Sequence, residues 1–177
     1  MRNIVIIGGS KGIGNAILLQ QLENNKVYNI SRTATEISHP NLTHFSLDVL
    51  NDMLPEIENV DTLIYCPGSI TLKPIGNLNI DDFRNDFEIN VIGAVKAIQK
   101  YLPALKKGFN PSIILFSTVA AKLGMPFHAS IATAKSGVEG LVKSLGAELA
   151  SSVRVNAIAP TITETSLSAG ILRNDRM

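Results

Sequence analysis

Short runs of apolar and β-branched residues alternate along the whole chain with stretches in which apolar residues recur at steps of three and four. The runs have the length and composition of buried strands. They lie at residues 3–8, 26–31, 42–47, 60–66, 112–117 and 152–158. The other stretches have the spacing of helices packed against a core. They lie at residues 13–23, 80–107 and 130–149.

Two further details complete the pattern of expected elements. Pro55 leaves room for only a short helix over residues 50–58. Asn79 or Asp81 is expected to cap the long helix that follows, because both side chains can accept hydrogen bonds from free backbone N–H groups.

Strands that are apolar throughout and separated by helices indicate a parallel sheet with both faces covered. The sequence therefore predicts an α/β fold with a Rossmann-like, doubly wound parallel sheet. Its 177 residues suffice for one domain and contain no internal repeat or low-complexity linker. We expect a single domain over residues 1–177.

One helix face carries an unexpected charge. Lys135 lies on a stripe that is otherwise apolar and that the helix is expected to turn toward the core. The stripe consists of Ile131, Lys135, Val138, Val142, Leu145 and Leu149. A charged lysine at a buried position is costly unless its ammonium group is hydrogen-bonded or paired with another group.

Composition excludes several classes of function. Hydrophobic residues make up 45% and charged residues 18%, which is an ordinary globular balance. The net charge is +1 and Lys and Arg are scattered, so we expect no nucleic acid and no membrane as partner. Cys66 is the single cysteine, which rules out an internal disulfide, and we expect no metal site. The first apolar run is too short for a signal peptide, so we expect a cytoplasmic protein.

The glycine-rich segment "GGSKGIG" (8–14) joins the first strand to the first helix, where a phosphate-binding turn belongs in this architecture. The helix N-terminus offers free N–H groups and the positive end of its dipole. Glycines also serve tight turns for steric reasons alone. If the segment binds a dinucleotide, the residues involved are Gly8, Ser10, Lys11, Gly12, Ile13 and Gly14.

The end of the second strand indicates which dinucleotide is bound. It reads "NISRT" and contains Arg32 but no acid, and an arginine suits a ribose 2′-phosphate. Lys11 could add a second positive charge. NADP(H) is therefore favoured over NAD(H), although both cations could equally be solvated surface groups. Asp48 and Val49, after the third strand, could contact the adenine, or Asp48 could simply cap the short helix that follows.

Five motifs now occur in order: the glycine turn, "LDV" (47–49), a proline–glycine turn ending at Gly68, "NVIG" (90–93), and Lys135. Together they resemble the short-chain dehydrogenase/reductase superfamily over residues 1–165. The resemblance implies a catalytic group of Asn, Ser, Tyr and Lys. Asn90 and Lys135 match the Asn and the Lys, and Thr118 stands at the Ser position. Lys135 would then bind the nicotinamide ribose, and Asn90 would support a water chain to it.

The match breaks at the tyrosine, whose place is taken by Ile131. An isoleucine cannot donate a proton, and general acid catalysis contributes about 10²–10⁴-fold. His128 lies two helical turns before Lys135 and is a candidate acid, as in divergent enoyl-acyl-carrier-protein reductases that place their tyrosine seven residues before the lysine. A solvated surface histidine is the alternative. In "PTITET" (160–165), Pro160 and Ile162 are expected at the nicotinamide, although Thr161 replaces the family's glycine.

Each surviving residue also has a purely structural interpretation. Ile131 could be ordinary core. Asn90 could satisfy buried backbone groups. Thr118 could make a local backbone bond at the end of a strand.

The leading hypothesis is an NADP(H)-dependent short-chain oxidoreductase that acts on a carbonyl or enoyl substrate with an altered proton donor. The alternatives are a non-catalytic NADP(H)-binding sensor or partner-stabilising protein, and a fold remnant that binds nothing. The family resemblance implies a homodimer or homotetramer formed through the two long helices. Residues 159–177 could form a substrate lid but not also the last helix and strand of the family, so we expect that the sequence is truncated.

Overall fold

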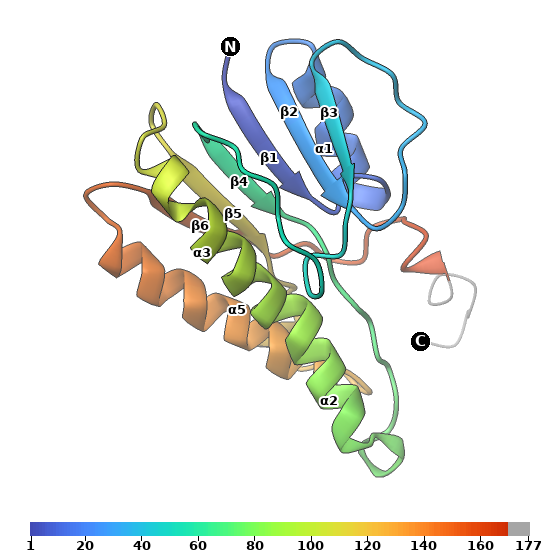
Figure 1. Cartoon of the computed structure of the whole chain (residues 1–177). Coiled ribbons are helices and arrows are strands. Elements are labelled where there is room, and N and C mark those ends of the chain that lie inside the picture. The colour runs from blue at the N-terminus through green and yellow to red at the C-terminus, as the bar shows by residue number, and fades with distance from the viewer. Residues whose placement is uncertain (170–177) are drawn as a thin grey trace.

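In the computed structural model of the protein, which describes residues 1–169, six parallel strands form one sheet in the order β3-β2-β1-β4-β5-β6 (Figure 1). The strands are β1 (Asn3–Ile7), β2 (Lys26–Ser31), β3 (Leu42–Ser46), β4 (Thr62–Tyr65), β5 (Ser112–Phe116) and β6 (Arg154–Ile158). Every neighbouring pair is parallel. This order confirms the predicted doubly wound sheet. Strands β2 and β3 are added on one side of β1, and strands β4 to β6 are added on its other side.

Helices cover both faces of the sheet (Figure 1). Helix α1 (Gly12–Leu22) lies on one face. The other face carries α2 (Ile80–Phe87), η2 (Glu88–Ile92), α3 (Gly93–Leu105) and α5 (Ala129–Glu148). Two short pieces, η1 (Ile75–Asn77) and α4 (Ala120–Leu123), lie in connections. No helix within residues 1–169 is long and apolar enough to cross a membrane.

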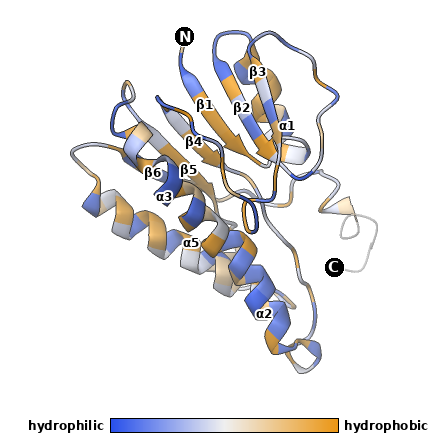
Figure 2. Ribbon diagram, in the orientation of Figure 1, coloured by the Kyte–Doolittle hydropathy of each residue, from blue (hydrophilic) through white to orange (hydrophobic). Residues whose placement is uncertain are grey.

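Alternate residues of each strand supply two separate layers of core. On the α1 side, Ile4 and Ile6 pack with Leu18 and Leu22. On the other side, strand residues such as Val5 pack against η2, α3 and α5. Figure 2 shows β1 hydrophobic over most of its length and α2 mostly hydrophilic, as expected for a buried strand and a helix that reaches beyond the sheet.

The predicted helix over residues 80–107 is interrupted. Asn79 caps its start, since the Asn79 side chain accepts from the Asp82 N–H at 2.8 Å. Residues Glu88–Ile92 then form a π-helix. The Tyr65 hydroxyl donates to the Ile89 carbonyl at 2.6 Å, and a Cβ at Gly93 would overlap that hydroxyl. A wide turn of this kind re-aims the side chains that it carries.

The predicted short helix over residues 50–58 is wrong. The chain there forms a turn and then runs without regular structure. The Asp48 carboxylate accepts from the Leu50 N–H at 2.9 Å and from the Asn51 side-chain amide at 3.1 Å. This Asx turn satisfies the local donors, and Pro55 removes the N–H that a helix would need next.

All six strands end at one edge of the sheet, so the loops that carry the predicted site residues gather there. The segment after β6 joins them, because the Val119 N–H donates to the Pro160 carbonyl at 3.3 Å. The predicted lid over residues 159–177 is described only as far as residue 169, and residues 170–177 lie outside the described part of the chain.

Candidate functional site

The glycine turn is built so that helix α1 starts with free N–H groups. Gly8 and Gly12 have φ values of 80° and 55°, which favour glycine. A Cβ at Gly14 would overlap the Gly8 carbonyl. Lys11 is the N-cap residue, and no side chain in the described structure caps the helix. The N–H groups at this end are therefore available to an anion.

A network of buried polar side chains holds the glycine turn against strands β2 and β3. Asn29 is fully buried, and its Oδ1 accepts from the Gly9 N–H at 2.9 Å. Its Nδ2 lies 3.0 Å from Nδ1 of His44, whose pKa is lowered by burial, so the neutral ring can accept there. The Ser10 hydroxyl donates to the Thr33 carbonyl at 2.7 Å. Ser10, predicted to bind the cofactor, therefore also ties the turn to the end of β2.

A small cavity of about 60 Å³ lies beside the turn and unites four predicted residues. Its lining includes Gly8, Arg32, Asp48 and Val49. Arg32 is exposed and, like Lys11, forms no ion pair with residues 1–169. The Asp48 carboxylate is occupied by the turn that it closes. No helix follows Asp48, so the predicted helix-capping role is wrong; its carboxylate closes a turn instead, while Val49 lines the cavity.

Lys135 occupies the opposite end of the site. Its Nζ donates to the carbonyl of Phe116, the last residue of β5, at 2.8 Å. Burial lowers the pKa of Lys135 to about 8, while the charges of Cys66 and Asp86 act in the raising direction. Burial also raises the pKa of the Cys66 thiol to about 12. At neutral pH the ammonium is therefore charged and poorly solvated, next to a neutral thiol.

The π-helix turns Asn90 into the same region, where 1% of its surface is exposed. Its Nδ2 donates to the Ser69 hydroxyl at 3.0 Å and to the Asp86 backbone carbonyl at 2.7 Å. Its Oδ1 is buried and finds no donor in the described part of the chain. A Cβ at Gly68 would lie 3.4 Å from this oxygen and 3.7 Å from Nζ of Lys135. The structure therefore brings Gly68, Asn90 and Lys135 together around one unsatisfied acceptor.

Thr118 and Ser117 do not join this group through their hydroxyls. Thr118 Oγ1 accepts from the Ala120 N–H at 3.3 Å, at the start of α4. Ser117 Oγ donates to Glu139 at 2.9 Å. Ile131 packs in the core with 4% of its surface exposed. The structural interpretations given above therefore describe contacts that are present. Thr118 makes a local backbone bond, Ile131 belongs to the core, and the amide nitrogen of Asn90 satisfies a buried backbone carbonyl.

His128 lies at the N-cap of α5, immediately before the helix that carries Lys135. Its Nδ1 lies 2.6 Å from the Pro126 carbonyl. A carbonyl only accepts, so Nδ1 carries the proton. An acid at this position would therefore act through Nε2 of the protonated ring.

The segment after β6 crosses to the glycine turn. Thr165 Cγ2 lies 3.2 Å from the place of a Cβ at Gly12. The Thr165 N–H donates to the buried Ser168 hydroxyl at 3.0 Å, which holds this part of the segment in a local turn. Ile162 is exposed. Thr165 was missed in the sequence, although it is the last residue of the "PTITET" motif.

These residues fit a dinucleotide laid along the carboxyl edge of the sheet. The turn and the N-terminus of α1 suit a pyrophosphate, and the cavity between β2 and β3 suits an adenosine. The orphaned Asn90 oxygen and the Lys135 ammonium stand at the other end. Besides Thr165, the sequence did not single out Asn29, Ser69 or Asp86, whose contacts join residues far apart along the chain.

Known proteins resemble the chain along nearly its whole length. Residues 46–177 match the family described as enoyl-(acyl carrier protein) reductase. Benzil reductase ((S)-benzoin forming) of Bacillus subtilis (strain 168) is 27% identical over 192 residues, covering 97% of this chain and 78% of the relative.

Solved structures share the fold. A short chain dehydrogenase family protein from Francisella tularensis superposes with a TM-score of 0.87 at 23% identity, over 98% of this chain and 74% of that one. A substituted form of ElxO with NADPH bound gives a TM-score of 0.84 at 25% identity, over 98% and 79%. The chain thus spans about three quarters of the length of these proteins.

The buried ammonium of Lys135 makes a prediction about stability. Because its pKa falls from 10.5 to about 8 on folding, the unfolded chain holds more protons between these values, and stability must rise with pH there. Relative to Lys135→Met, the wild-type protein should gain on the order of 3 kcal/mol of unfolding free energy between about pH 7 and about pH 10.5. Urea unfolding at several pH values measures this gain.

Lys143→Met is the matched control, since Lys143 is an exposed lysine on the same helix. Its stability difference from the wild type should not change with pH. A flat difference for Lys135→Met as well would show that the Lys135 ammonium is fully hydrated in the folded protein.

Proposed function

The chain belongs to the short-chain dehydrogenase/reductase family, and we propose that it is an NADP(H)-dependent oxidoreductase that acts on a carbonyl, alcohol or enoyl substrate with an altered proton donor. One observation carries the proposal. Asn90 and Lys135 meet at Gly68 with an unsatisfied buried oxygen and a poorly solvated ammonium. Both groups cost free energy that a bound ligand would offset.

NADP(H), when bound, supplies or accepts the hydride. The N–H groups of the glycine turn would bind its pyrophosphate, and Arg32 with Lys11 would pair with the 2′-phosphate. Lys135 would hold the nicotinamide ribose through the N–H groups that Phe116 leaves free. The relative that binds NADPH supports this choice of cofactor.

The proton donor is the altered part of the site. Ile131 offers no proton, so we propose that His128 supplies it from Nε2 at the start of α5. The Thr118 hydroxyl accepts from the Ala120 N–H, and its own O–H would donate to the substrate oxygen and polarise it. A histidine titrates near neutral pH and can therefore both give and regain a proton.

The loops that follow β4, β5 and β6 expose large apolar side chains at the substrate side of the sheet. They are Ile70, Leu123, Met125, Phe127, Ile162 and Leu167. Backbone hydrogen bonds join these loops, for example from the Lys73 N–H to the Phe127 carbonyl at 3.2 Å. We propose that the substrate has an apolar body, which these side chains would cover.

A sensor that binds NADP(H) without turnover is the second candidate. It is favoured by Ile131, which extends the core cleanly where the family has its tyrosine. Both candidates need the same cofactor residues and differ only in whether a proton reaches the substrate.

A cytoplasmic location stays a prediction, as does the role of residues 159–169 as part of a substrate lid.

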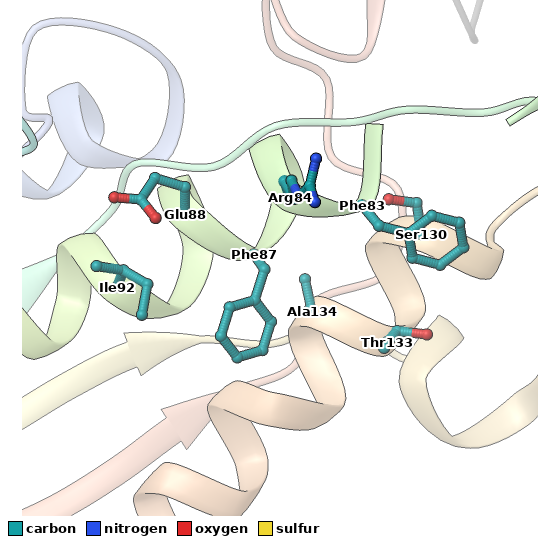
Figure 3. Close-up of a pocket in the computed structure, with 8 residues that line it drawn as sticks. All are labelled: Phe83, Arg84, Phe87, Glu88, Ile92, Ser130, Thr133 and Ala134. Atoms are coloured by element: carbon teal, nitrogen blue, oxygen red, sulfur yellow. The ribbon is translucent and has the colours of Figure 1, made fainter. Parts of the chain in front are cut away.

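We also propose a homodimer through the outer faces of α2, η2 and α5. A groove of about 410 Å³ opens there, and neither Gly68 nor Lys135 is among the residues that line it (Figure 3). Phe83 and Phe87 line it from α2, Ile92 lines it from η2, and Ala134 lines it from α5. Phe87 keeps 41% of its surface exposed. Burying such an apolar surface favours association with a second copy.

NADPH should bind more tightly than NADH, and Arg32→Asp should weaken NADPH binding by about 10- to 100-fold. The same change should strengthen NADH binding, because a carboxylate accepts from the ribose hydroxyls. Fluorescence titration of both nucleotides measures the change. Lys107→Asp makes the same change of charge beyond the end of α3 and should leave both affinities unaltered. Equal loss in both variants would refute a phosphate contact at Arg32.

NADPH should be consumed with apolar ketones or enoyl thioesters and not with sugars. His128→Ala should lower kcat by about 10²-fold while leaving NADPH affinity unchanged. His39→Ala serves as control, since His39 lies in the loop before β3. Binding without turnover across the panel would favour the sensor. Turnover that survives His128→Ala would place the proton donor elsewhere.

Phe87→Glu should convert a dimer into a monomer in sedimentation experiments at micromolar concentration, because it would place a charge in the apolar groove. Phe109→Glu is the control, since Phe109 is 81% exposed but lies outside the groove. A monomeric wild-type protein would contradict the proposal.

A further inference from the structure

A fully buried carboxylate lies directly behind the proposed site. Asp86, in the last turn of α2, has 0% of its surface exposed. No ion pair reaches it within the described residues. Its oxygens instead lie against three hydroxyl groups. The distances are 2.5 Å from Oδ1 to Ser69, 3.2 Å from Oδ1 to Thr71 and 2.6 Å from Oδ2 to Ser130.

Three hydroxyl groups surround the Asp86 carboxyl group and can satisfy it by hydrogen bonding. An ionised carboxylate only accepts, so each hydroxyl can direct its proton toward it. The donors come from the loop after β4 and from α5, and the carboxylate comes from α2. Asp86 therefore joins the loop that bears Gly68 and the helix that bears Lys135 to α2, which leads directly into the π-helix that bears Asn90. An apolar side chain would fill this place without the cost of burying a charge, so packing alone does not explain an aspartate.

The same residue controls the amide of Asn90. The Ser69 hydroxyl gives its proton to Asp86 and so offers a lone pair to Nδ2 of Asn90 at 3.0 Å. The backbone carbonyl of Asp86 accepts from the same Nδ2 at 2.7 Å. Both N–H bonds of the amide are thus used on the Asp86 side. Oδ1 is left unpaired beside the space that a Cβ at Gly68 would fill, and Nζ of Lys135 borders the same space.

We infer that Asp86 is a positioning residue: through Ser69 it fixes the Asn90 carboxamide so that the amide oxygen stays free on the side of Gly68 and Lys135, and its charge acts on the Lys135 ammonium. This inference rests on the proposed function in taking Asn90 and Lys135 as the reacting end of the site.

The electrostatics agree with this role. Lys135 is influenced by two titratable groups, Cys66 from β4 and Asp86 from α2, and both raise its pKa against the larger, lowering effect of burial. The Cys66 thiol stays protonated at neutral pH because burial raises its pKa to about 12. Asp86 is then the group whose charge favours the ammonium form under working conditions.

The first test removes the charge but keeps the shape. In protein labelled with ¹³C at lysine Cε, the titration of Lys135 is followed by NMR and assigned with Lys135→Met. Asp86→Asn should lower the Lys135 midpoint by about one pH unit, as expected when a nearby opposite charge is lost. An unchanged midpoint would overturn the electrostatic part of the inference.

The second test cuts the link to Asn90 with a matched control. Ser69→Ala removes the hydroxyl between Asp86 and the amide, whereas Thr71→Val removes a hydroxyl from the same carboxylate oxygen without touching Asn90. Exchange of the Asn90 side-chain amide protons with water should accelerate at least about tenfold in Ser69→Ala and stay at the wild-type rate in Thr71→Val. Ser69→Thr keeps the hydroxyl and should restore slow exchange.

Equal exchange rates in Ser69→Ala and Thr71→Val would show that the cluster is merely structural and overturn the positioning role. If Asp86→Asn does not fold, the Ser69 and Thr71 variants decide alone. Neither readout needs nucleotide or turnover. A protein that binds no NADPH but shows both effects would refute the proposed function and leave the inference standing.

Discussion

A charged lysine on the core side of a helix must be compensated, and much of the site is arranged around that requirement. Lys135 emerges from the stripe that includes Ile131 and Val138, and its ammonium reaches the carbonyl of Phe116. That carbonyl is free because β5 ends there, at the carboxyl edge of the sheet. One hydrogen bond does not satisfy an ammonium with three N–H groups. The charge of Asp86 offsets part of the cost of burial, but the pKa of Lys135 still falls to about 8, which leaves a requirement that a polar ligand beside Gly68 would meet.

The second half of the site depends on a break in helical geometry. In a regular α-helix the backbone N–H of each residue donates to the carbonyl four residues earlier, and this pattern is broken around Asn90. The π-helix adds one residue to the turn, and Tyr65 holds it open by bonding to the Ile89 carbonyl. Gly93 makes room for that hydroxyl. The N-x-x-G spacing is therefore a packing requirement, in which the glycine serves the tyrosine and the turn serves Asn90.

The doubly wound parallel sheet and most elements could be predicted because each element leaves a local signal. Apolar runs, helical spacing and the glycine turn are all read within about ten residues of sequence. The short helix over residues 50–58 failed because a side chain of the preceding residue, Asp48, competes for the backbone N–H groups. The π-helix, the Asn29 support and the Asp86 cluster could not be predicted, because their contacts join positions about 15 to 48 residues apart. Partners at such distances are fixed by topology and leave no periodic trace in the sequence.

An isoleucine at position 131, where the family resemblance implies a tyrosine, bears on chemistry and not on nucleotide binding. An isoleucine at position 131 improves the core, so a protein that no longer needed the site could drift further toward stability by replacing the lysine and the two buried polar residues beside it. Lys135, Asn90 and Asp86 are all still present, and each carries a desolvation cost that the fold alone does not offset. A remnant that binds nothing has no use for three such costs at one place. An enzyme and a sensor would both use these groups to bind NADP(H). They differ in whether any group at the start of α5 can pass a proton to the substrate.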